Sequence, residues 1–240
     1  MKKKNGFTLI ELLVVISIIA LLMSMLMPAL ARVREQAKTV SCMARLKQWG
    51  VVFEMFTEDN NGYFNDFICI EDDVFFEYYQ DYEMKICPQA TKLYEEGGRD
   101  PFATHIELCD ETPASYGTNA WQTNVAGSNR GDDYLWKTPN VKQSDLVPVY
   151  GDLQRFSNTT PFAFDNPPSY SSEPHTPGNI DEIKNACIIR HRNIVQWLFA
   201  DWSVRKVGLK ELWDLRWHRH WVEEKEQAGE PDWPEWMESL

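Results

Sequence analysis

Three side chains in this sequence have the types and the placement for joint chemistry: His191, Asp201 and Asp152. Each lies at or near the end of a short apolar run of the kind that forms a β-strand. If these strands are neighbours, a histidine–carboxylate hydrogen bond can brace the turn between them. The alternative is a metal site, where a transition metal is favoured over calcium because imidazole is a ligand for softer ions. We expect bracing, with no catalytic residue and no cofactor.

The cysteines form the second reactive set. There are five, so at least one thiol has no partner within the chain. A disulfide between Cys42 and Cys87 would join a helical apolar stripe to the loop that opens at Pro88. A bond between Cys87 and Cys109 is the alternative, and the sequence does not choose between the two.

Acidic residues are concentrated in the middle of the chain. Residues 58–133 hold 17 Asp or Glu and four Lys or Arg, within a chain whose net charge is -12. This balance excludes a protein that binds nucleic acid through its phosphates, which requires clustered cations. A solvated acidic face is the expected role of the stretch, and a calcium or other divalent metal site is the alternative. The possible ligands are Asp59, Asp66, Glu71, Asp72 and Asp73.

Short strands and one helix must position these groups. The alternation of apolar residues predicts strands at 146–153, 186–189, 195–200 and 203–207, the last two forming a hairpin that turns at Asp201-Trp202. A helix is expected from Leu209 to Glu226. Its apolar face, suited to core packing, would carry Leu209, Trp213, Trp217 and Trp221. Residues 230–240, which include two prolines, are expected to form a loose tail.

The N-terminal third has a different character. Leu12–Ala31 is a run of 20 residues without charge, preceded by three lysines and by Glu11. A helix of that length spans about 30 Å, the thickness of the apolar core of a membrane. The helical pattern continues to Asn60-Asn61-Gly62, so one helix of about fifty residues is predicted. Its second half carries an apolar stripe made of Cys42, Leu46, Trp49, Phe53 and Phe56.

Glu11 at the edge of an apolar span needs an explanation, because an unpaired carboxylate in a membrane is costly. A secretory signal cleaved after Ala31 and an uncleaved signal anchor both leave Glu11 unexplained. The lysine-rich leader followed by Gly6-Phe7-Thr8-Leu9-Ile10-Glu11 and a long apolar helix resembles the class III signal of type IV prepilins and type II secretion pseudopilins. The head motifs Cys87-Pro88, Tyr150-Gly151-Asp152 and His191 with Asp201 resemble pseudopilin-like proteins of planctomycete-group and lentisphaera-group bacteria.

The resemblance implies a pilin-like α+β fold and a structural role. Prepilin peptidase would cleave between Gly6 and Phe7, Phe7 would be N-methylated, and Glu11 would pair with the new amino terminus of a neighbouring subunit. The implied organisation is a leader (1–6), a transmembrane helix (7–31), an amphipathic spine (32–60), a head (61–229) and the tail.

The same resemblance implies a location and partners. The protein would cross the inner membrane once, with its head outside the cytoplasm, and would assemble with other pilin-like subunits into a pilus or a type II secretion-type pseudopilus. One departure is Trp202, which stands where the family has a glycine suited to a tight turn. The alternative function is a secreted or anchored binding protein or enzyme whose apolar segment is only an export signal.

Overall fold

The chain contains two compact units, Met1–Lys38 and Thr39–Leu240, and we refer to the second as the globular unit. The computed structural model of the 240-residue chain describes residues 8–64, 78–79, 81–93, 101–106, 112–123, 131–154, 158–171, 173 and 182–240.

Helix α1 runs from Leu9 to Asp59, which confirms the predicted helix of about fifty residues. It continues through Pro28 and ends where the sequence predicted a stop. There the Gly62 N–H donates to the Thr57 carbonyl at 2.7 Å, and Asn61 and Gly62 both have positive φ values, of 58° and 81°. Left-handed residues of this kind terminate helices by satisfying the last carbonyls.

The first half of α1 has no buried face. Every described residue from Thr8 to Lys38 is exposed, including the continuous apolar run between Leu12 and Ala31. By length and composition, this helix could cross a membrane. A helix that is apolar all round requires lipid or other helices around it, because water would face hydrocarbon on every side.

The globular unit is built on a five-stranded sheet with the order β5-β3-β4-β6-β7. Its strands are antiparallel neighbours except β5, which pairs with β3 in parallel. A separate antiparallel pair is formed by β1 and β2. The strand bounds are β1 His105–Ile106, β2 Pro113–Ala114, β3 Tyr116–Asn119, β4 Pro148–Asp152, β5 Asn158–Thr159, β6 Ile194–Phe199 and β7 Val204–Gly208. The predicted α+β arrangement of a long N-terminal helix and a mainly antiparallel sheet is confirmed.

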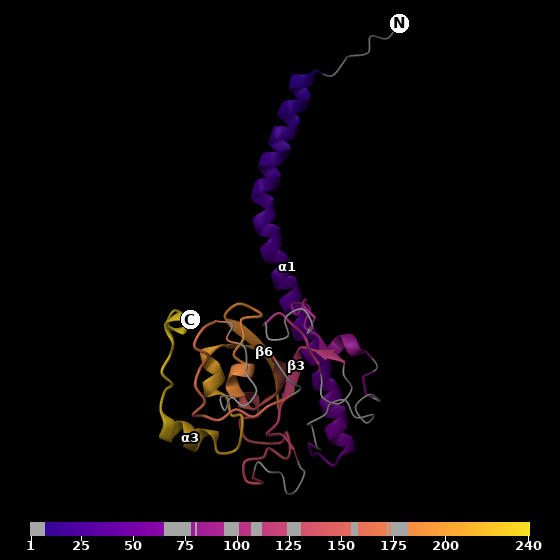
Figure 1. Ribbon diagram of the computed structural model, residues 1–240. Helices are drawn as coiled ribbons and strands as arrows, with labels where there is room; N and C mark the ends of the chain where they lie inside the picture. The colour runs from indigo at the N-terminus through magenta and orange to yellow at the C-terminus, as the bar shows by residue number, and fades with distance from the viewer. Residues whose placement is uncertain are drawn as a thin grey trace. The chain divides into compact units, whose positions relative to one another are not determined.

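The sheet separates two apolar cores because side chains alternate across a strand. Leu198 of β6 packs with Trp49 and Phe53 of α1 on one face. Trp197 of the same strand packs with Trp213 and the C-terminal segments on the other. Figure 1 shows β6 and β3 in the globular unit, with the C-terminal half of α1 and the helix α3 in the same unit. The sheet is therefore a middle layer, buried on both faces.

Gly151 lies in the middle of β4, where the sheet leaves no room for a side chain. A Cβ atom built there would lie 2.5 Å from the Gln196 carbonyl oxygen and would also overlap the Trp197 ring. We expect Gly151→Ala to lower the free energy of unfolding by about 1–3 kcal/mol, the usual cost of overpacking. Gly208→Ala is the matched control, because its new Cβ would lie 3.8 Å from the nearest neighbouring atom, Glu211 Cβ.

The measurement is denaturant unfolding of the full chain in detergent micelles, followed by tryptophan fluorescence. All ten tryptophans lie at or after Trp49, so this signal reports only on the globular unit. Equal stability of Gly151→Ala and Gly208→Ala would contradict the close approach of β4 to β6.

The predicted tryptophan-rich helix from Leu209 to Glu226 is wrong as a single element. The chain forms a 3-10 helix, η5, at Lys210–Asp214 and a separate helix, α3, at Trp221–Ala228, with an extended residue, Leu215, after η5. The expected packing role is correct, since all three tryptophans of the stripe are buried. Two of their indole N–H groups explain the break, because each donates to a backbone carbonyl that a continuous helix would have used: Trp217 to Leu212 at 2.8 Å and Trp221 to Trp213 at 3.1 Å.

The C-terminal residues are not a loose tail, contrary to the expectation. They form a short helix, α4, at Glu235–Glu238, and Met237 is fully buried. The Trp236 indole donates to the Pro168 carbonyl at 2.9 Å, and the Trp233 ring packs edge-on against Trp213. Two aromatic side chains and one methionine therefore hold the end of the chain against the apolar core that contains Trp197 and Trp213.

The apolar run 186–189 is buried except for the partly buried Ile189, but it is not a strand. It follows a 3-10 helix, η4, at Glu182–Asn185, and its N–H groups bond locally, Cys187 to the Ile183 carbonyl and Ile188 to the Ala186 carbonyl, each at 3.0 Å. A turn closes at once, with the Arg192 N–H donating to the Ile189 carbonyl at 3.0 Å. This turn places Arg190 and His191 side by side.

The predicted hairpin at Asp201-Trp202 is present between β6 and β7. Trp202 adopts a left-handed backbone, with φ of 61°, although it is not glycine. Its ring lies parallel to the Phe53 ring, with an interplanar angle of 4°, and meets the Phe64 ring edge-on. Aromatic packing against α1 therefore offsets the strain of a large side chain at this position.

Candidate functional site

The N-terminus of α1 is closed by a reciprocal pair of side chains. Thr8 Oγ1 accepts from the Glu11 N–H at 3.3 Å, while Glu11 Oε2 accepts from the Thr8 N–H at 2.8 Å and from the Thr8 hydroxyl at 2.7 Å. This is a capping box, which satisfies N–H groups that the first turn cannot. Glu11 therefore has a local role that the sequence analysis missed, although Thr-x-x-Glu is its usual signal. The predicted processing residues, Gly6 and Phe7, lie outside the described residues.

Asp152 lies at the end of β4 and forms a buried ion pair with Arg190. The Arg190 Nη1 atom is 2.9 Å from Asp152 Oδ1, and both side chains are fully buried. The remaining guanidinium hydrogen bonds go to backbone carbonyls at 2.7–2.8 Å, those of Pro101, Ser115 and Leu153. Sequence reasoning missed Arg190, although a cation directly after an apolar run was a usable signal.

The surroundings of Asp152 favour its charged form. Burial raises its pKa, but the nearby His191 and Arg190 side chains and the Gln196 N–H, which donates to Oδ2 at 2.9 Å, outweigh this. The pKa of Asp152 is therefore held below its ordinary value of 3.8. The ion pair accordingly stabilises the fold above the ordinary pKa, and this contribution is lost only as the pH falls further.

His191 is the centre of a second set of contacts. Its Nε2 atom lies 3.5 Å from Asp152 Oδ2 and 3.3 Å from Cys87 Sγ, and its Nδ1 atom lies 3.4 Å from Thr39 Oγ1. The His191 and Asp152 side chains are fully buried. The arrangement thus links α1, the Cys87 loop and the sheet, and a substrate has no direct access to it.

Asp201 is not part of this cluster, which corrects the expectation that it pairs with His191. It is exposed at the tip of the β6–β7 hairpin, where its Oδ1 atom accepts from the Ser203 N–H at 2.9 Å. His191 contacts the neighbouring strand carboxylate, Asp152, because the turn at Ile189–Arg192 lies beside the end of β4. The bracing histidine–carboxylate pair is therefore His191–Asp152.

Cys42 and Cys87 form a disulfide, with their Cα atoms 5.2 Å apart and a sequence separation of 45. Cys42 lies on the buried stripe of α1, and both cysteines are fully buried. Cys187 is a free, buried thiol. Cys69 and Cys109 lie outside the described residues, and so does the alternative pairing of Cys87 with Cys109.

The acidic residues considered for calcium are mostly outside the described part of the chain. Asp66, Glu71, Asp72 and Asp73 fall there. Asp59, the exception, accepts a hydrogen bond from the Tyr78 hydroxyl at 2.6 Å. This contact fastens the end of α1 to the segment that follows it.

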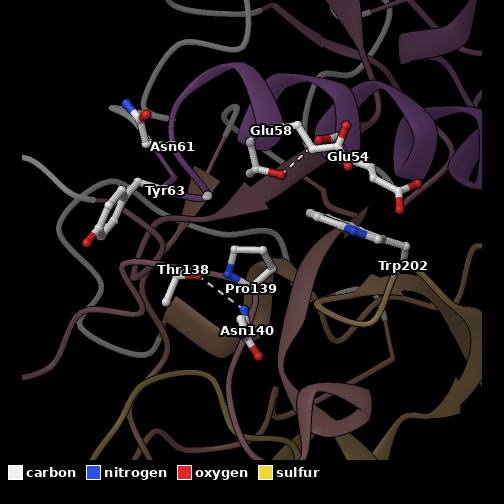
Figure 2. A pocket seen from close by; sticks show the side chains of 10 residues that line it. Glu54, Glu58, Asn61, Tyr63, Thr138, Pro139, Asn140 and Trp202 are labelled. Carbon is white, nitrogen blue, oxygen red and sulfur yellow. Dashed lines mark hydrogen bonds between the residues drawn. The ribbon is translucent and has the colours of Figure 1, made fainter.

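A shallow cavity of about 390 Å³ opens beside the end of α1. Figure 2 shows Glu54 and Glu58 on the helix facing Trp202 of the hairpin turn, with Pro139 and Asn140 on the other side. The Asn140 N–H donates to Thr138 Oγ1 at 3.2 Å and fixes that side of the cavity. The cavity is open and acidic.

His218 is a buried histidine surrounded by aromatic rings, and sequence reasoning missed it. Its ring contacts Trp121, Tyr134, Phe162 and Trp221, with centroid distances between 5.0 and 5.7 Å. Burial, with a smaller contribution from the His220 charge, lowers the pKa of His218 to about 3. Glu224 Oε2 lies 3.3 Å from its Nε2 atom but without hydrogen-bond geometry, so burial dominates.

We expect His218 to make the fold sensitive to mild acid. Below the ordinary pKa of 6.5, His218 takes up a proton in the unfolded chain, whereas in the folded chain it does so only near pH 3. The free energy of unfolding should therefore fall by up to about 1.4 kcal/mol per pH unit as the pH decreases through this window. His218→Phe, which keeps the ring packing, should flatten that dependence.

Denaturant unfolding at several pH values, read by tryptophan fluorescence, measures the slope. His220→Gln is the control, because the His220 side chain is 42% exposed and should leave most of the slope in place. An equal slope in the parent and in His218→Phe would contradict this assignment.

Part of the chain, including its N-terminal region, is similar to known proteins. Residues 1–27 match the model of the prokaryotic N-terminal methylation motif. The chain is similar to the type IV wide pilus major component PilA4 of Thermus thermophilus, with 44% identity over 63 residues. These findings support a type IV prepilin-like protein.

The similarity is confined to part of both proteins. The matched segment covers 26% of this chain and 48% of the Thermus protein, so the chain spans about half the length of the curated relative it matches. No solved structure matches the chain.

Proposed function

We propose that this protein is a structural pilin-like subunit. Prepilin peptidase cleaves it between Gly6 and Phe7, Phe7 is N-methylated, and the mature chain assembles through α1 into a pilus or a type II secretion-type pseudopilus. The single observation that carries the proposal is the match of residues 1–27 to the N-terminal methylation motif. The subunit spans the inner membrane once before assembly, with the globular unit outside the cytoplasm, and it is not an enzyme.

The exposed apolar half of α1 supports this role. Between Leu12 and Ala31 the helix is uncharged and is exposed on all sides. Before assembly, lipid would cover this surface, and afterwards the helices of neighbouring subunits would cover it. A soluble binding protein or enzyme has no use for such a helix once it has been exported.

Glu11 is proposed to serve assembly by its charge. Within one chain its carboxylate accepts two hydrogen bonds from Thr8, as a helix cap, and no described residue of the span offers it a cation. Cleavage after Gly6 would create an ammonium group on Phe7 of each subunit. Pairing of that ammonium with Glu11 of a neighbour relieves the desolvation of both charges.

Mass spectrometry of the mature N-terminus tests the processing step. The protein should be expressed in a bacterium that has a prepilin peptidase and then purified from membranes or filaments. We expect a chain that begins with N-methylated Phe7. A chain that begins at Arg32 would indicate an ordinary secretory signal, and one that begins at Met1 an uncleaved anchor; either result would overturn the proposal.

Two substitutions separate the charge of Glu11 from its capping function. Glu11→Gln keeps an oxygen that can accept from the Thr8 N–H but removes the charge, whereas Glu11→Val removes both. We expect both variants to be cleaved normally and both to lose incorporation into filaments or crosslinked oligomers. Ser24→Ala, which removes a hydroxyl that donates to the Leu21 carbonyl of the preceding turn, should assemble normally. Normal assembly of Glu11→Gln would show that assembly does not need the charge of Glu11.

A further inference from the structure

We propose that the dithiol form of this protein binds one Zn²⁺ ion through Cys42 Sγ, Cys87 Sγ and His191 Nε2, at the site where the oxidised protein has its disulfide. The ligand atoms of these three residues lie within 4.8 Å of one another and all three residues are buried. The chain is synthesised with free thiols, so the dithiol form precedes the disulfide.

The distances suit a tetrahedral ion after a small local opening. With Zn–S bonds of about 2.3 Å and Zn–N bonds of about 2.0–2.1 Å, the ligand atoms of such an ion are about 3.5–3.8 Å apart. His191 Nε2 already lies 3.3 Å from Cys87 Sγ. The two sulfurs must separate from a bonded pair to about 3.8 Å, and Cys42 Sγ and His191 Nε2, which lie within 4.8 Å of each other, must come to about 3.5 Å.

A contact on the other ring nitrogen orients the His191 imidazole for this role. Thr39 Oγ1 lies 3.4 Å from His191 Nδ1, where it can accept a hydrogen bond from the ring N–H and leave the Nε2 lone pair for the metal. Thr39 is half-buried and receives a hydrogen bond from the half-buried Gln89 amide at 3.3 Å.

The surrounding charges also balance. Two thiolates neutralise Zn²⁺, and the adjacent Asp152 carboxylate is already neutralised by Arg190 at 2.9 Å. Binding releases the two thiol protons to solvent, because the metal binds the thiolate form of each cysteine. Each of these buried charges therefore keeps a partner, which removes the usual obstacle to a metal in a dry core.

Oxidation then exchanges the ion for the disulfide. A disulfide donor takes two electrons from the two thiolates and two protons from solvent and becomes two thiols. The Cys42 and Cys87 sulfurs are thereby oxidised and form the Cys42–Cys87 bond. Both sulfurs lose their thiolate character in that step, so Zn²⁺ departs. The metal would thus hold α1 and the Cys87 loop together until the covalent bond forms.

Cobalt absorption provides the first test, on the full chain in detergent micelles. The chain carries Cys69→Ser, Cys109→Ser and Cys187→Ala, which leave only the two proposed thiols, and it is reduced with a trialkylphosphine. We expect one Co²⁺ per chain, with thiolate charge-transfer and tetrahedral d–d bands that Zn²⁺ abolishes by displacement. The oxidised chain should show neither band, and His191→Ala should weaken binding at least about tenfold. Absent bands after reduction, or equal binding after oxidation or in His191→Ala, would overturn the proposal.

Thiol protection provides a second test that does not depend on any variant. The reduced parent chain is alkylated with and without Zn²⁺, and each cysteine is read by mass spectrometry. We expect Zn²⁺ to slow modification of Cys42 and Cys87 at least about tenfold and to leave that of Cys187 unchanged. Equal rates at Cys42 and Cys87 with and without the ion would reject the site even if His191→Ala failed to fold.

Discussion

Asp152→Asn is expected to lower the free energy of unfolding by about 3–5 kcal/mol, because it leaves a buried cation without its counterion. The Arg190 guanidinium is fully buried and is 2.9 Å from Asp152 Oδ1. Asparagine has nearly the same volume and still offers one oxygen, so the change removes the charge and not the packing. The measurement is denaturant unfolding of the full chain in micelles, followed by tryptophan fluorescence.

Asp201→Asn is the matched control for this prediction. Asp201 is exposed, and its contact with the Ser203 N–H at 2.9 Å requires an oxygen but no negative charge. We expect this variant to unfold within about 0.5 kcal/mol of the parent, as surface substitutions usually do. If the two variants were equally stable, the buried pair would not be the bond that holds β4 to the turn at Ile189–Arg192.

The double variant Cys42→Ala/Cys87→Ala is expected to lose about 4 kcal/mol in the absence of metal. The disulfide closes a segment of 45 residues, and the chain-entropy relation for a loop of that length gives this value. Cys187→Ala, which removes a buried thiol but no crosslink, should cost much less. The same unfolding assay measures both, and a double variant as stable as Cys187→Ala would contradict the prediction.

The sequence was sufficient for elements whose signal is local. The uncharged run Leu12–Ala31 and the stop at Asn60-Asn61-Gly62 predicted α1, and alternation in 195–200 and 203–207 predicted the β6–β7 hairpin. The edge strand β5 and the short β3 were not predicted. Each has few residues, and their pairing depends on partners that are distant in sequence.

The errors in the site have a common physical cause. Tertiary hydrogen bonds decided whether Asp152 or Asp201 would face His191, and sequence spacing carries no information about them. Likewise, the periodicity of Trp213, Trp217 and Trp221 is helical, but the indole N–H groups of Trp217 and Trp221 donate to backbone carbonyls that a continuous helix would occupy. Residues 186–189 show the same limit: their apolar composition predicted a strand, whereas their N–H groups bond locally.

The covalent bond between Cys42 and Cys87 also determines how the protein carries mechanical load. A pull applied through α1 passes at Cys42 directly to Cys87, so the residues between them bear no tension even if they unfold. Fully extended, a segment of 45 residues could lengthen the chain by roughly 150 Å. The oxidised protein cannot gain that length, so within the globular unit a pull applied through Cys42 can lengthen only the chain that follows Cys87.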